Sequence, residues 1–230
     1  MVKKRGLGHV EAVITLVIFI GFLIFAFTFF NPFRANRTLT STLDYSWREV
    51  EDATSDNIES YSVVIGSALP QLVAISIPGT NLNASVVDSS GNKVLSFTDL
   101  LGGVHFARPT DNFAVIRYSK QFTKGSTIAG TPLTQSDYII SSSDSKLARY
   151  ETLFLELNRS YYSNYTGLKK QFNLPNRVEF GFSVIFADGS KIEAYQNIPA
   201  GVEILSKSDR VEIVRLNGID EYGEVFVRVW

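Results

Sequence analysis

Few side chains in this sequence are of the types that perform catalytic chemistry. Its two histidines are His9, near the N-terminus, and His105, which follows two glycines. A catalytic triad needs a histidine beside a nucleophile, and no Gly-X-Ser-X-Gly elbow accompanies His105. The acids Glu49, Glu51 and Asp52 fall on the solvent side of a helical pattern, whereas a glycosidase holds its carboxylates in a cleft. We therefore predict no enzymatic activity.

The sequence does not indicate a metal or cofactor site either. It contains no cysteine, which excludes disulfides, thiolate zinc sites and cysteine nucleophiles. Two histidines are too few for a zinc site built from histidines. The oxygen-rich segments 88–92 and 217–221 lack the calcium-loop pattern, and turn chemistry explains them. Since no phosphate loop or dinucleotide fingerprint is present, we predict that the protein binds no metal and no cofactor.

Glu11 is the charged residue that most needs a partner. It stands at the start of an uncharged, largely apolar stretch from Ala12 to Phe30. At about 1.5 Å per residue this stretch makes a helix of roughly 28 Å, close to the roughly 30 Å of a bilayer's hydrocarbon core. A carboxylate at that depth costs a few kcal/mol when nothing pairs with it. We expect a transmembrane helix over 7–33 whose acid requires a cationic partner.

The residues before this helix resemble a processing signal. They form a short basic segment, Lys3, Lys4 and Arg5. A basic segment that ends in Gly6, followed by an apolar helix with Glu11 at the fifth position, is similar to the class III signal peptide of archaeal type IV pilin-like proteins. The resemblance covers about 28 residues of the 230. It implies that a prepilin peptidase cuts between Gly6 and Leu7, so that residues 1–6 are a leader.

The resemblance also implies how subunits assemble. Cutting after Gly6 creates an α-ammonium on Leu7 with a pKa near 8, about one helical turn from Glu11. In the family the acid pairs with the N-terminus of a neighbouring subunit in the filament core, which favours both ionised forms. His9 departs from the family, in which a small or apolar residue is common at this position. The alternative is an uncleaved membrane anchor whose Glu11 reaches the lipid headgroups.

The charge distribution restricts the partners and the location. Residues 1–37 carry five Lys and Arg against one acid, which leaves 17 against 22 for the rest, a net charge near −5. No basic patch follows Arg37, so we predict no nucleic-acid partner. The basic N-terminus favours a cytoplasmic start and a head outside the cell. The expected partners are other pilins, copies of this chain, the prepilin peptidase and membrane lipid.

Four Asn-X-Ser/Thr triplets are candidate N-glycosylation sites, which fits a head outside the cell. They begin at Asn36, Asn83, Asn158 and Asn164. The last two fall at the edges of a helical apolar stripe. We therefore expect glycans there less than at Asn83.

The rest of the chain predicts an α+β head on a stalk. Asn31-Pro32 ends the first helix, and apolar spacing predicts a second helix over 38–56 within a stalk of 34–60. The head, 61–230, is β-rich with one long packed helix that begins near Ser141 and ends by Pro175. Apolar or alternating runs predict strands at 61–65, 72–77, 84–87, 93–97, 113–118, 178–186, 191–195, 202–205, 211–216 and 224–230. Serine clustering leaves a division into two units near 141–145 as an alternative.

The function that these patterns favour is a subunit of a cell-surface filament similar to a type IV pilus, either a pilin or a minor pilin. It would be held in the cell membrane before assembly and would then present its head outside the cell. The alternative is a single-pass, membrane-anchored surface binding protein or adhesin that does not polymerise.

Overall fold

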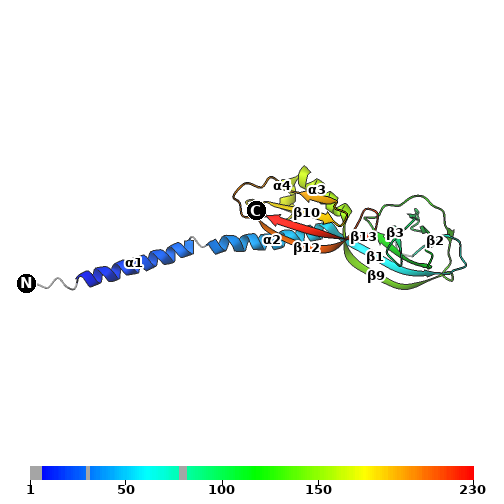
Figure 1. Cartoon of the computed structure of the whole chain (residues 1–230), viewed down its shortest axis with the longest axis horizontal. Helices are drawn as coiled ribbons and strands as arrows, with labels where there is room; N and C mark the ends of the chain where they lie inside the picture. Colours follow the sequence, from blue (N-terminus) through cyan, green and yellow to red (C-terminus); the bar gives the residue numbers. More distant parts are fainter. Residues whose placement is uncertain (1–6, 30–31, 78–81) are drawn as a thin grey trace, which may run out of the picture.

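The computed structural model describes residues 7–29, 32–77 and 82–230 of this chain. It is elongated, with the helix α1, Leu7–Phe29, at one end, the helix α2, Pro32–Thr54, running into the nearer of two lobes, and the second lobe beyond it (Figure 1). Between α2 and the third helix, α3, lie nine strands. They are β1 Ser55–Ile65, β2 Leu72–Ile75, β3 Asn83–Asp88, β4 Lys93–Val94, β5 Ser96–Thr98, β6 Val104–Ala107, β7 Phe113–Ser119, β8 Thr131–Pro132 and β9 Tyr138–Tyr150. The chain then forms α3 Glu151–Ser163, α4 Tyr165–Gln171, β10 Phe180–Phe186, β11 Lys191–Ala194, β12 Leu205–Val214 and β13 Asp220–Val229.

The strands of the described chain form two sheets. The larger has nine strands in the order β11-β10-β13-β12-β9-β1-β7-β3-β4, and the smaller has four in the order β5-β6-β2-β8. The pairing of β12 with β9 is short, since only Ile213 with Arg149 and Val214 with Tyr150 are in register. The larger sheet therefore divides at this point into two parts that serve different lobes.

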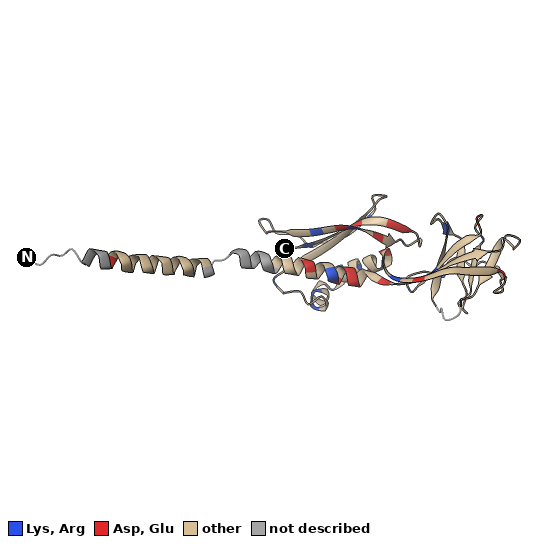
Figure 2. Cartoon of the chain, turned by 90° about the horizontal axis from the view of Figure 1, so that it is seen from below, with Lys and Arg blue, Asp and Glu red and all other residues tan. Residues whose placement is uncertain are grey.

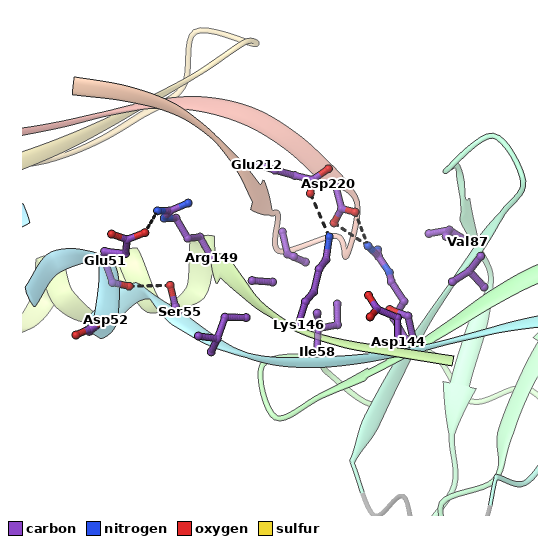
Figure 3. Close-up of a pocket in the computed structure, with 16 residues that line it drawn as sticks. Glu51, Asp52, Ser55, Ile58, Val87, Asp144, Lys146, Arg149, Glu212 and Asp220 are labelled. Carbon is purple, nitrogen blue, oxygen red and sulfur yellow. Dashed lines mark hydrogen bonds and ion pairs between the residues drawn. The ribbon is translucent and has the colours of Figure 1, made fainter. Parts of the chain in front are cut away.

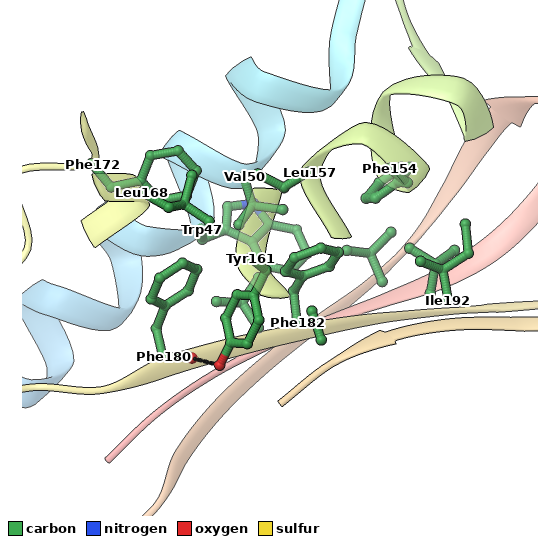
Figure 4. Close-up of a cluster of buried hydrophobic side chains, with 14 of the residues drawn as sticks. Trp47, Val50, Phe154, Leu157, Tyr161, Leu168, Phe172, Phe180, Phe182 and Ile192 are labelled. Carbon is green, nitrogen blue, oxygen red and sulfur yellow. Dashed lines mark hydrogen bonds between the residues drawn. The ribbon is translucent and has the colours of Figure 1, made fainter. Parts of the chain in front are cut away.

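The proximal lobe consists of α2, α3, α4 and β10 to β13. Helices cover one face of its four strands, and Figure 4 shows the aromatic side chains that fill the space between the layers. Trp47 and Val50 of α2 are buried against Phe154 of α3 and against Phe180 and Phe182 of β10. Apolar residues recur three and four positions apart along α2. This spacing places them on one face of the helix, and that face is buried.

The distal lobe consists of β2 to β8 with the outer halves of β1 and β9. Its core is formed by apolar side chains from both sheets, including Val63, Val73, Phe106 and Ile116, each of them fully buried. The turn between β3 and β4 is held by Asp88, whose Oδ1 accepts from the backbone N–H groups of Ser90 and Asn92. This confirms the turn predicted at 88–92.

Most predicted strands are present, although their bounds differ by a few residues. The strand predicted at 202–205 is wrong, because β12 begins only at Leu205. The sequence patterns missed β6, β8 and β9. The predicted second helix is confirmed as α2, although it ends at Thr54 and β1 follows directly. Of the expected break at 31–32, residue 31 lies outside the described residues and Pro32 begins α2.

The expected fold class, an α+β head with one long packed helix, is wrong. Residues 138–150 form β9, which pairs with β1 from Tyr138 to Arg149. The rest of the predicted helix forms two helices, α3 and α4. They are separated at Asn164, whose φ of −152° is not helical. Pairing with β1 outweighs the helical spacing of the apolar residues here. The described chain is strand-rich, with four helices.

The expected single-pass transmembrane helix is also wrong. Within 7–29, 32–77 and 82–230, no helix is long and apolar enough to cross a membrane.

The proximal core generates a testable prediction. Tyr161 is 1% exposed, and its hydroxyl donates to the carbonyl O of Phe180 at 2.6 Å and accepts from the N–H of Gln196 at 3.1 Å. Tyr161→Phe leaves these two groups without that partner, so we expect a loss of about 1–3 kcal/mol in the free energy of unfolding, measured in urea. The neighbouring Tyr162 is 63% exposed. Tyr162→Phe should therefore cost less than about 0.5 kcal/mol, and equal losses would contradict the interpretation.

Candidate assembly element and interlobe groove

Helix α1 carries the predicted assembly residue Glu11. This side chain is exposed, and its backbone carbonyl accepts a hydrogen bond from the Thr15 hydroxyl at 2.8 Å. Leu7 begins α1, but its side chain lies outside the described part of the structure, as does that of His9. The leader charges Lys3, Lys4 and Arg5 and the cleavage residue Gly6 also lie outside it. Cleavage and the pairing of Leu7 with Glu11 therefore stay predictions.

The described part of α1 is apolar on every side. Figure 2 shows it without a basic residue and with a single acid near its start. Large apolar side chains on all its faces are between 38% and 76% exposed; they are Val13, Ile14, Leu16, Val17, Ile18, Phe19, Ile20, Phe22, Leu23, Ile24, Phe25 and Phe27. A helix that is hydrophobic all round is normally buried. In this single chain α1 instead extends away from both lobes (Figure 1).

A groove of about 490 Å³ lies where the two lobes meet (Figure 3). Its floor includes Ile58 of β1 and Lys146 of β9, and Glu212 and Asp220 line it from β12 and β13. The Nζ of Lys146 lies 3.4 Å from Glu212 Oε2, with both side chains about half exposed. The groove holds both signs of charge. No group of three or more potential ligands among the described residues could hold a metal ion.

One ion pair, between a buried arginine and a partly exposed aspartate, connects the lobes at this groove. Arg117 of β7 is 6% exposed, and its Nη1 lies 2.7 and 2.8 Å from the two carboxylate oxygens of Asp220. Its Nη2 donates to the carbonyl O of Gly218 in the turn between β12 and β13. No pattern in the sequence indicates this pair. The two residues are 103 positions apart, and no local pattern relates them.

Apolar contacts also hold the joint between the two lobes, which lies beside this groove. Ile58, Phe122, Tyr150 and Val214 form a small separate core where β1, β7, β9 and β12 approach one another. Burial raises the pKa of Tyr150 to about 12. Gly218 has a φ of +81°, and a Cβ there would lie 2.4 Å from the Ser85 hydroxyl of the distal lobe. A glycine is therefore required for the turn to reach the distal lobe.

His105 lies within a strand and is bound on both ring nitrogens. It lies in β6, where its Nδ1 accepts from the N–H of Gly130 at 3.1 Å and its Nε2 lies 3.1 Å from Asp99 Oδ2. Asp99 also accepts from the N–H groups of Leu101 and Gly103. Burial opposes ionisation of Asp99, but these hydrogen bonds outweigh it and hold the pKa of the carboxyl below its usual value. The histidine thus stabilises the turn between β5 and β6.

The structure places the candidate glycosylation residues in different surroundings. The Nδ2 of Asn83 donates to the carbonyl O of Phe122 at 2.7 Å, and that of Asn158 donates to the carbonyl O of Glu193 at 2.6 Å. Asn164 is exposed and caps α4 through its Oδ1. Asn36 lies in α2, and its side chain is outside the described part. Among the three described side chains this geometry favours Asn164, which reverses the expected preference for Asn83, while glycosylation itself stays a prediction.

Comparison with known protein families, with curated proteins and with solved structures finds no match to this chain.

The ion pair at the joint generates a second prediction. Arg117→Gln removes a buried guanidinium and leaves both the Gly218 carbonyl and Asp220 without it. Because about a third of Asp220 remains exposed and can be hydrated, we expect a loss of about 2 kcal/mol in the free energy of unfolding, below the range for fully buried pairs. Urea unfolding measures it.

Lys146→Gln is the matched control, because it removes a half-exposed ion pair in the same groove. It should cost less than about 1 kcal/mol. A cost for Lys146→Gln as large as that for Arg117→Gln would show that the buried pair has no special role in joining the lobes.

Proposed function

We propose that this chain is a subunit of a surface filament similar to a type IV pilus, processed after Gly6 and assembled through α1, with its lobes outside the cell. The observation that carries the proposal is the apolar surface of α1, which is exposed on all sides in the single chain. Exposed apolar surface of this extent marks an interaction site. In a bundle of α1 helices, each helix would be covered by its neighbours.

The position of Glu11 supports the same assembly. The acid is exposed near the start of α1, where packing among apolar helices would remove it from water. Burial of an unpaired carboxylate is costly, whereas burial beside a cation favours its ionised form. After cleavage, the α-ammonium of Leu7 from a neighbouring subunit would supply that cation. Pairing would thereby fix the axial position of each new subunit.

The arrangement of the lobes is compatible with this role. The two lobes lie at the opposite end of the chain from α1 (Figure 1). Neighbouring α1 helices would therefore meet along the axis while the lobes face outward. Lys207 of β12 and Asp44 of α2 form an ion pair of 2.8 Å, and Trp47 packs in the proximal core. These contacts attach the lobes to α2 rather than to α1.

Processing is the first step that can be tested. The mature protein isolated from its native cells should begin at Leu7, as read by N-terminal sequencing and intact mass. Gly6→Val should block cleavage and leave a chain that begins at Met1. A wild-type chain that begins at Met1 would overturn the processing step.

Assembly is tested separately with Glu11→Ala. This variant should be processed and exported at the wild-type level but should yield at least tenfold less sheared filament, because it lacks the acceptor for the ammonium. Glu156→Ala, which removes an exposed acid from α3, is the control and should leave the yield unchanged. Unchanged filament yield in Glu11→Ala would sink the pairing role. Absence of filaments from wild-type cells would favour a surface binding protein that does not polymerise.

A further inference from the structure

Strand β9 has an open edge along most of its length. On one side β9 pairs with β1 from Tyr138 to Arg149, whereas on the other side only Arg149 and Tyr150 pair with β12. Within the described residues no strand pairs with the outer edge between Tyr138 and Ala148. The side chains of residues 139–147 are all exposed. Such an edge presents unpaired backbone donors and acceptors that can bind another strand.

We propose that this edge binds the same edge of a second copy of the chain, with the two β9 strands antiparallel. Seven residues are available for pairing, Ser142 to Ala148. At one end, the register shift against β1 at Ser141 disrupts the ladder. At the other end, Arg149 is occupied by β12. These limits place Ser145 at the centre, opposite Ser145 of the partner subunit.

The charges on β9 select this register. Centring on Ser145 places Asp144 opposite Lys146 of the partner subunit, and by symmetry Lys146 opposite Asp144 of the partner subunit. Opposite charges directly across a strand pair stabilise it. If one strand is moved by two residues along the other, in either direction, the two Asp144 side chains or the two Lys146 side chains lie opposite each other. Like charges directly across a strand pair are destabilising. The edge is therefore complementary to itself in one register and repulsive in the adjacent ones.

The partner's side chains would also meet on the opposite face. In this register Ser143 lies opposite Leu147 of the partner subunit. Leu147 is 71% exposed in the single chain. Pairing would cover part of this apolar surface on both copies.

The inference does not rest on the filament proposal, because the edge belongs to the lobes and is the same in an unassembled chain. Two copies that meet in this way are related by a two-fold axis, so the contact closes on itself. In a filament built from α1 helices, successive subunits are related by a screw operation instead. The β9 contact would then join the lobes of two filaments side by side.

Cysteine cross-linking of the full-length chain tests the register, since the protein has no cysteine of its own. Opposite residues of an antiparallel pair have Cα atoms about 4.5–5.5 Å apart, within the range that a disulfide spans. With copper phenanthroline as oxidant, the purified full-length Ser145→Cys chain should form a disulfide-linked dimer. Ser143→Cys alone should not, because the two Ser143 Cα atoms would be about 14 Å apart.

Mixed expression supplies the matched control. Ser143→Cys together with Leu147→Cys on a second copy should restore the dimer, because these positions face each other. All three positions are exposed on the same strand, so differences in their accessibility do not explain a selective pattern. Equal cross-linking of Ser143→Cys and Ser145→Cys, or no cross-linking of Ser145→Cys, would overturn the proposal.

A charge reversal tests the partner's identity. Within the Ser145→Cys background, Asp144→Lys should lower the dimer yield at least tenfold, because a lysine would then face Lys146 of the partner subunit. The double reversal Asp144→Lys with Lys146→Asp restores opposite charges in the same register and should recover most of the yield. The double variant also loses the exposed pair with Glu212, which contributes little. Failure of the double reversal to recover the yield would show that the edge does not bind a second copy.

Discussion

The ion pair between the buried Arg117 and the partly exposed Asp220 is the interaction on which the arrangement of the two lobes depends. The distal lobe is inserted between α2 and α3, so β1 and β9 form its covalent connection to the rest of the chain. A two-stranded ribbon alone bends and twists easily. Arg117 resists this by linking the distal sheet to the turn between β12 and β13. A buried guanidinium is costly to leave unpaired, which favours the closed joint.

At the joint between the lobes, this ion pair is accompanied by close packing of residues from both lobes. Gly218 lets the turn approach Ser85 of the distal lobe, and Val214 packs beside Tyr150 and Ile58. Arg215, in the same turn, binds Glu151 of α3 at 2.9 Å and Glu221 of β13 at 2.6 Å. The turn is thus fixed to the proximal lobe by one arginine and to the distal lobe by another. Both lobes are held relative to α2, which continues directly into β1.

Local chemistry determines which parts of this fold were predictable. Asp88 and Gly91 specify their hairpin through an acid that binds backbone N–H groups and a glycine with a φ of +80°, and both signals are visible in the sequence. Strand β9 was missed because its leucine and tyrosine spacing also fits a helix, and only its partner β1 decides between them. The pair of Arg117 and Asp220 was missed for a related reason, since burial and proximity both arise from the tertiary fold. Gly6, Leu7 and Glu11 could be proposed from the sequence alone, because the signal that they resemble is a linear pattern; their roles stay predictions.

Two surfaces of this chain are open to other copies, and their symmetries differ. Apolar α1 has no distinct face, so it can be covered from all sides and favours a structure in which each subunit repeats the contacts of the last. The β9 edge offers one row of backbone groups, which a single strand saturates. A contact of the first kind extends without limit, whereas one of the second kind ends after two copies. If both form, the α1 contacts determine the length of an assembly and the β9 contacts determine how assemblies associate laterally. The contacts of Arg117 then matter for both, because they set the direction in which the β9 edge faces relative to the helices.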